Sequence, residues 1–148
     1  MPISQNILLE EDIEIASLVR IIKDSGRNIL EIDSDHFWIE GNEFTNIQIG
    51  HVKNKRSICI FAGCPLSDDI TGVECALLAN RLNVESDVAR FYVRFSEFTK
   101  QYVLFVDHYI FYTEALITSQ FFTALQFVEF YALEFDITPY YDCDRTLN

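Results

Sequence analysis

The sequence is poor in basic residues, in glycine and in proline. Its 148 residues include 11 Lys and Arg against 23 Asp and Glu, a net charge of -12, with five Gly and three Pro. Phosphate backbones and anionic lipid surfaces are bound largely through Lys and Arg, so this deficit argues against nucleic-acid binding and against attachment to a membrane surface. So few glycines also leave little from which to build a loop that cradles phosphate.

Long apolar runs and export signals are also missing. The most apolar region, residues 121–135, is broken by Thr, Gln and Glu and falls short of the roughly 18 uninterrupted apolar residues of a membrane span. The first six residues contain no basic stretch ahead of an apolar one, so no signal peptide is expected. The four cysteines lack CxxC spacing and indicate reduced thiols in the cytoplasm; they are Cys59, Cys64, Cys75 and Cys143.

No recognisable catalytic or cofactor motif occurs. The chain has no Gly-x-Gly-x-x-Gly, no Gly-x-x-x-x-Gly-Lys-Ser/Thr, no Gly-x-Ser-x-Gly, no His-Glu-x-x-His and no Ca²⁺-loop pattern. We therefore expect a non-enzymatic protein with no catalytic residues and no cofactor.

What the chain has in quantity is apolar and aromatic residues, at 49% and 14% of the total. This composition predicts an ordered core, and no stretch rich in Gly, Pro or Ser divides the chain. We expect a single domain over residues 1–148. Its tail, residues 138–148, has no continuing period and is expected either to lie across the surface or to be mobile.

Periodicity predicts the order of the elements. Apolar residues at three- and four-residue spacing, followed by Gly26, predict a first helix over residues 10–25. Runs rich in β-branched and aromatic residues predict strands over 28–32, 36–40, 44–52 and 57–62. A second helix is expected over 70–83, with Asp69 as its N-cap and with Val73, Leu77 and Leu78 on its buried face.

Strands over 89–95 and 101–112 and a final helix from Thr118 to about residue 135 complete the chain. Such an order predicts an α+β fold in which helices pack mainly on one face of an antiparallel sheet.

Two groups of possible metal ligands are explained more simply as structural residues. His51, Cys59 and Cys64 are of types that bind zinc, but they lack the close spacing of structural zinc sites, and we expect them to pack within the fold. The Asp pairs at 33/35, 68/69 and 142/144 fall in turns, at a helix start and in the tail, where Asp bonds nearby backbone amides. No metal site is therefore expected.

A basic strip on one sheet face is the first candidate binding surface. Arg90 and Arg94 are four residues apart in a strand and so point to the same face. The candidate residues on this face are Arg90, Tyr92, Arg94, Phe105 and Tyr109. The strip either binds a ligand or is an ordinary exposed face with interspersed charge.

The final helix is the second candidate. It is apolar around most of its circumference, more than one sheet face can bury. Either the helix is sandwiched between the sheet and the tail, or another chain covers part of it. The candidate residues for a partner-binding or dimer surface are Phe121, Phe122, Leu125, Val128 and Tyr131.

Three short motifs carry a family resemblance. Asn80-Arg81-Leu82-Asn83 ends the second predicted helix, Ala89-Arg90-Phe91-Tyr92-Val93 follows it, and Ile117-Thr118 precedes the last helix. In these motifs and in the order of its elements the chain resembles the YbjN family of bacterial proteins, and it is similar to type III secretion chaperones. The resemblance covers about residues 10–136.

The resemblance implies a chaperone-like protein, or a regulator of sensory transduction linked to stress response or motility. It implies a cytoplasmic homodimer that binds a protein client, and it transfers no catalytic residue. One alternative is a small-molecule sensor with an aromatic pocket formed on the sheet by Phe91, Tyr92, Phe105 and Tyr109. A second alternative is an enzyme that uses His51 or His108 with a carboxylate.

Overall fold

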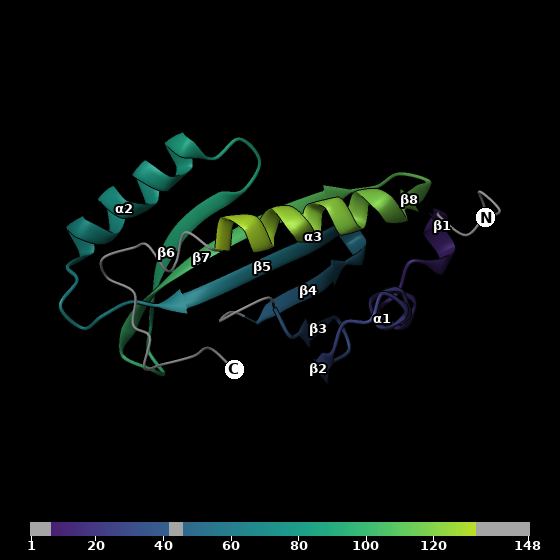
Figure 1. Cartoon of the computed structure of the whole chain (residues 1–148), viewed down its shortest axis with the longest axis horizontal. Coiled ribbons are helices and arrows are strands. Elements are labelled where there is room, and N and C mark those ends of the chain that lie inside the picture. Colours follow the sequence, from purple (N-terminus) through teal and green to yellow (C-terminus); the bar gives the residue numbers. More distant parts are fainter. Residues whose placement is uncertain (1–6, 42–45, 133–148) are drawn as a thin grey trace.

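The computed structural model describes residues 7–41 and 46–132. Over these residues the fold is α+β, as the sequence predicts, with a six-stranded antiparallel sheet in the order β2-β3-β4-β5-β7-β6 (Figure 1). The strands are β1 (Ile7–Leu9), β2 (Ile29–Ile32), β3 (His36–Ile39), β4 (Ile47–Val52), β5 (Ser57–Pro65), β6 (Arg90–Ser96), β7 (Gln101–Phe111) and β8 (Ala115–Ile117). The helices are α1 (Ile15–Asp24), α2 (Gly72–Glu85) and α3 (Thr118–Ala132), and two short 3-10 turns are η2 (Glu10–Asp12) and η3 (Lys53–Lys55).

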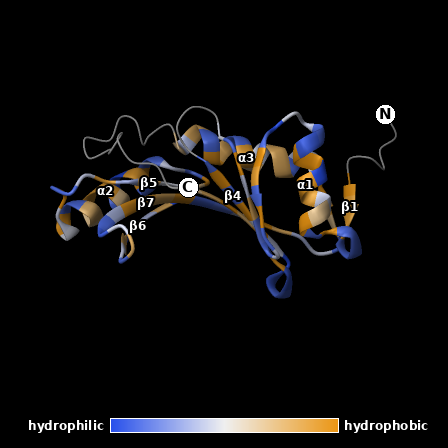
Figure 2. Cartoon of the chain, turned by 90° about the horizontal axis from the view of Figure 1, so that it is seen from below, coloured by the Kyte–Doolittle hydropathy of each residue, from blue (hydrophilic) through white to orange (hydrophobic). Residues whose placement is uncertain are grey.

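The helices cover one face of the sheet. Alternate strand residues such as Phe37, Ile49 and Ile60 point to this face and are completely buried. They share one core with Leu18 of α1 and Leu125 of α3. Figure 2 shows α3 lying along the strands on one side of the sheet. The opposite face of the sheet has no described helix on it.

The second helix begins at a different residue from the one predicted, and a different side of it is buried. Its N-cap is Thr71, whose hydroxyl accepts a hydrogen bond from the Glu74 amide while the Glu74 carboxylate accepts one from the Thr71 amide, so Asp69 as N-cap is wrong. Of the predicted buried face only Leu78 is buried. Val73 and Leu77 are 71% and 63% exposed, because Cys75, Leu78 and Leu82 form the side that packs on the core.

Two short strands escaped the sequence-based prediction. β1 and β8 pair antiparallel in a separate two-stranded sheet, from Ile7↔Ile117 to Leu9↔Ala115. Three residues are too few for an alternating pattern to be recognised, since periodicity needs at least about four. The first part of the predicted strand at 44–52 and the predicted tail at 138–148 lie outside the described residues.

Candidate functional site

The helix-free face of the sheet gathers the predicted strip of basic and aromatic residues. Register and strand alternation place side chains from four strands on this face: Trp38 of β3, Cys59 and Phe61 of β5, Arg90, Tyr92 and Arg94 of β6, and Phe105, Asp107, Tyr109 and Phe111 of β7. All five predicted sheet-face residues therefore share one surface. We call this surface the aromatic face.

Four rings form a continuous row across the aromatic face. The ring centroids of Trp38 and Phe61 are 5.8 Å apart, and those of Phe61 and Phe105 are 6.0 Å apart. Tyr92 stacks on Phe105 at 5.2 Å with an interplanar angle of 21°. Each ring is only partly buried. The row is thus a continuous apolar strip that is partly exposed.

Two arginines flank the Tyr92 end of the row. The guanidinium carbons of Arg90 and Arg94 lie 5.0 and 5.2 Å from the centroid of the Tyr92 ring. Arg90 donates hydrogen bonds to both carboxylate oxygens of the buried Asp107, at 3.2 and 2.6 Å, which raises the pKa of Arg90. Arg94 is exposed and forms no ion pair within the described part of the chain. Its charge is therefore available to an acidic group of a ligand.

At the other end of β7, Tyr109 and Phe111 extend the aromatic face. Their rings stack at 6.2 Å with an interplanar angle of 18°. Tyr109 lies opposite Cys59 on β5, and a hydrogen bond with that thiol raises the pKa of Tyr109 to about 12. Burial raises the pKa of the Cys59 thiol, which keeps the thiol protonated at neutral pH.

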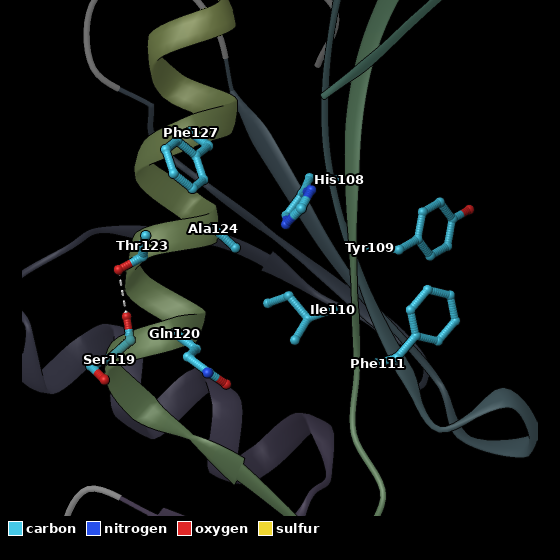
Figure 3. Close-up of a pocket in the computed structure, with 9 residues that line it drawn as sticks. All are labelled: His108, Tyr109, Ile110, Phe111, Ser119, Gln120, Thr123, Ala124 and Phe127. Atoms are coloured by element: carbon cyan, nitrogen blue, oxygen red, sulfur yellow. Dashed lines mark hydrogen bonds between the residues drawn. The ribbon is translucent and has the colours of Figure 1, made fainter. Parts of the chain in front are cut away.

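The predicted aromatic pocket on the sheet is not assembled as the sequence suggested. Phe91 points to the opposite, helix-covered face and is 2% exposed, because neighbouring residues of a strand point to opposite faces. A cavity of about 370 Å³ does lie between β7 and α3, and Figure 3 shows its lining residues. His108 and Ile110 point toward α3, and Tyr109 and Phe111 point away from it. The cavity therefore opens beside the edge of the aromatic face rather than on it.

Most of the predicted partner surface on the last helix lies in the core. Phe121, Leu125 and Val128 are completely buried, so they cannot form a docking surface in the folded chain. Phe122 and Tyr131 are partly buried and pack against the same core. The helix also has apolar residues outside its buried side. The large apolar side chains that it exposes are Phe127 and Phe130, with exposed fractions of 38% and 62%.

The three histidines have separate partners. His36 contacts the exposed Asp35 carboxylate at 2.7 Å, His51 bonds the Tyr112 hydroxyl at 2.6 Å, and Nδ1 of His108 lies 3.2 Å from the Val88 carbonyl oxygen. Asp35 lies in the exposed bend before β3, and His36 is the first residue of β3.

The residues considered as metal ligands do not converge. Cys59 points to the aromatic face, whereas His51 and Cys64 point to the helix-covered face. Across residues 7–41 and 46–132, no three His, Cys, Asp or Glu side chains come together in a way that could hold a metal ion. Cys143 lies outside the described residues.

Two rings of the row across the aromatic face escaped the sequence-based prediction. Trp38 and Phe61 alternate correctly within their strands, but only the strand order brings them into line with Phe105.

No helix in the described ranges is both long and apolar enough to cross a membrane.

Comparison with solved structures finds a crystal structure of YbjN from E. coli, described as a "putative transcription regulator". The TM-score is 0.72 at 12% sequence identity, and the match covers 88% of this chain and 96% of that chain. No protein-family model matches the sequence, and a search of curated proteins finds no match either. The structural likeness establishes a YbjN-like fold.

Proposed function

We propose that this chain with a YbjN-like fold is a non-enzymatic, cytoplasmic, chaperone-like or regulatory protein that binds another polypeptide on its aromatic face. The observation that carries the proposal is the row of partly exposed rings ending at Tyr92, with Arg94 beside it and in no ion pair with a described residue. Aromatic and arginine side chains are the types enriched where proteins bind other proteins.

The chemistry of this face favours a polypeptide with apolar and acidic side chains. Apolar side chains of a partner would cover the row from Trp38 to Tyr92, and a carboxylate would pair with Arg94. The chain as a whole is acidic, at -12, so a local site for a negative group is a distinguishing feature of this face.

A matched pair of charge reversals tests the proposal. Arg94→Glu and Arg81→Glu change the net charge equally, but Arg81 is an exposed residue of α2 and not part of the aromatic face. In affinity capture from a bacterial lysate, we expect wild type and Arg81→Glu to retain the same partner and Arg94→Glu to lose it. Equal recovery by all three proteins, or recovery of no protein by the wild type, would contradict the proposal.

We further propose that the chain forms a homodimer. Support comes from α2, whose outer side carries Val73, Leu77 and Val84 with exposed fractions of 71%, 63% and 85%. These positions fall on one side of the helix at 100° per residue, as an apolar contact with a second helix requires. Light scattering after size-exclusion chromatography should give a dimer that Leu77→Lys converts to monomer; a wild-type monomer at micromolar concentration would refute this.

A link to stress response or motility is also part of the proposal, and it rests on the resemblance alone. A strain lacking the protein should show altered stress survival or swimming, and a strain unchanged in both would remove this part.

A further inference from the structure

We propose that the edge of β7 at His108–Phe111, together with the cavity between β7 and α3, binds an extended segment of the partner by strand addition. We call these four residues the β7 edge. The inference rests on the proposed function. It adds the strand edge beside the aromatic face at which a segment of the partner pairs, the direction of that segment and its sequence pattern.

The β7 edge arises because β6 is shorter than β7. The last pair between them is Arg90↔Asp107, whereas β7 continues beside β5 as far as Phe111↔Ser57. Beyond Asp107, β7 therefore has β5 on one side and no described strand on the other. An unpaired edge of this kind is a template for another strand.

At two residues of the β7 edge, the backbone N–H and C=O groups point away from β5. The Tyr112 amide donates to the Arg56 carbonyl at 3.0 Å, and the Tyr102 carbonyl accepts from the Leu66 amide at 2.9 Å. Even-numbered residues of β7 thus face β5, and the N–H and C=O groups of Tyr109 and Phe111 point away from it because directions alternate along a strand. These groups can pair with an added strand.

The neighbouring edge of β6 is occupied at Phe91. The Asn83 side-chain amide donates to the Phe91 carbonyl at 2.8 Å, and its oxygen accepts from the Phe91 amide at 2.7 Å. Asn83 thereby occupies the position that a partner strand would need at Phe91. In the described part of the chain no side chain does the same at Tyr109 or Phe111.

The side chains around the β7 edge define what an added strand would present. Residues opposite each other in an antiparallel pair share a face, so the partner residue opposite Ile110 would enter the 370 Å³ cavity beside Phe127 and Thr123. The partner residues opposite Tyr109 and Phe111 would lie beside the two stacked rings, which are 41% and 72% exposed (Figure 3). All three positions favour apolar side chains.

Charge at the two ends of the cavity favours basic flanks on the partner. Glu114 precedes β8 and the start of α3, and the Asp87 amide contacts the Tyr131 hydroxyl near the other end of α3. Both acidic residues are exposed and form no ion pair within the described ranges. The occupant is therefore an extended segment with three successive apolar residues, whose side chains point to alternate faces, and with Lys or Arg on either side of them. It would run antiparallel to β7 and continue the line of β6.

Selection from a random ten-residue peptide library on the full chain tests this pattern. We expect enriched peptides to carry a short apolar, β-prone core flanked by Lys or Arg. Failure to enrich any peptide, or enrichment of peptides without this pattern, would overturn the inference.

Variants then test the binding mode with the most enriched peptide as the probe. Phe111→Pro removes an outward-pointing N–H while leaving the pairing with β5 intact, and Phe111→Val keeps that N–H. We expect Phe111→Pro to weaken binding about tenfold relative to Phe111→Val, the loss typical of a well-formed backbone hydrogen bond. Thr123→Arg, at an exposed residue that lines the cavity, should also weaken binding.

Amide hydrogen exchange supplies a readout that a change in folding would not imitate. In the wild-type protein, peptide binding should slow exchange at Tyr109 and Phe111 and leave Ile110 unchanged, since the Ile110 amide already faces β5. Unchanged exchange at Tyr109 and Phe111 would overturn strand addition. If Arg94→Glu abolishes peptide binding but Phe111→Pro and Thr123→Arg do not, the proposed function stands and the β7 edge is excluded.

Discussion

Asn83 should contribute more to stability than a half-exposed polar residue usually does. Its side chain makes two hydrogen bonds to the backbone of Phe91, at 2.8 and 2.7 Å, and so joins the last turns of α2 to the outer side of β6. Each such bond contributes about 0.5–1.5 kcal/mol net, so Asn83→Ala should lower the free energy of unfolding by about 1–3 kcal/mol. The lower half of that range is expected if water reaches the Phe91 backbone in the variant.

Urea denaturation followed by circular dichroism measures this change. Asn80→Ala is a matched control, because Asn80 is an exposed residue of the same helix with no described side-chain hydrogen bond. The control should remain within about 0.5 kcal/mol of the wild type. A fall in unfolding free energy no larger for Asn83→Ala than for Asn80→Ala would refute the reasoning, as would an unaltered rate of amide exchange at Phe91.

Three further predictions concern the core and two titrating groups. Leu125→Ala removes a completely buried side chain of α3 and should cost about 2–5 kcal/mol in thermal or urea unfolding. Phe130→Ala, at a residue 62% exposed on the same helix, should cost far less, and similar losses would contradict the assignment of Leu125 to the core. Burial, and secondarily the charge of Lys53, lower the pKa of His51 below 6.5 in the folded protein. The unfolded chain therefore takes up a proton first, and the free energy of unfolding should fall as the pH drops below about 6.5, less steeply in His51→Gln than in the wild type. The phenol of Tyr109, whose pKa is raised to about 12, should ionise in this alkaline range when absorbance is followed during titration. A difference titration against Tyr109→Phe that places this ionisation near pH 10 would count against its hydrogen bond with Cys59.

Local sequence patterns were sufficient to predict strands and their faces wherever the side-chain period was unambiguous. The strand predicted over 101–112 appears as β7, because alternation every second residue separates Phe105 and Tyr109 from Val106. The same alternation is enough to place Arg90, Tyr92 and Arg94 on one face of their strand. The α+β class and the residues of the aromatic face on β6 and β7 follow from these patterns.

Which side of each helix is buried could be known only from the tertiary structure. Residues 118–132 are apolar around most of the helix, so periodicity could not tell Leu125, which is buried, from Phe130, which is exposed. In α2 the apolar residues also occupy more than one side, and packing selected Leu78 and Leu82 over Leu77. The core takes up only as much of an apolar helix as the sheet can cover.

The sequence by itself determined which residues could share a strand face, because that depends only on the two-residue period of a β-strand. Tertiary structure decided which strands are neighbours and where each one stops. The placement of β7 between β5 and β6 aligns Phe61, Phe105 and Tyr92 in one row, and the end of β6 at Arg90 leaves Tyr109 and Phe111 with an open edge. Both features depend on contacts between residues distant in the chain, which no local pattern encodes.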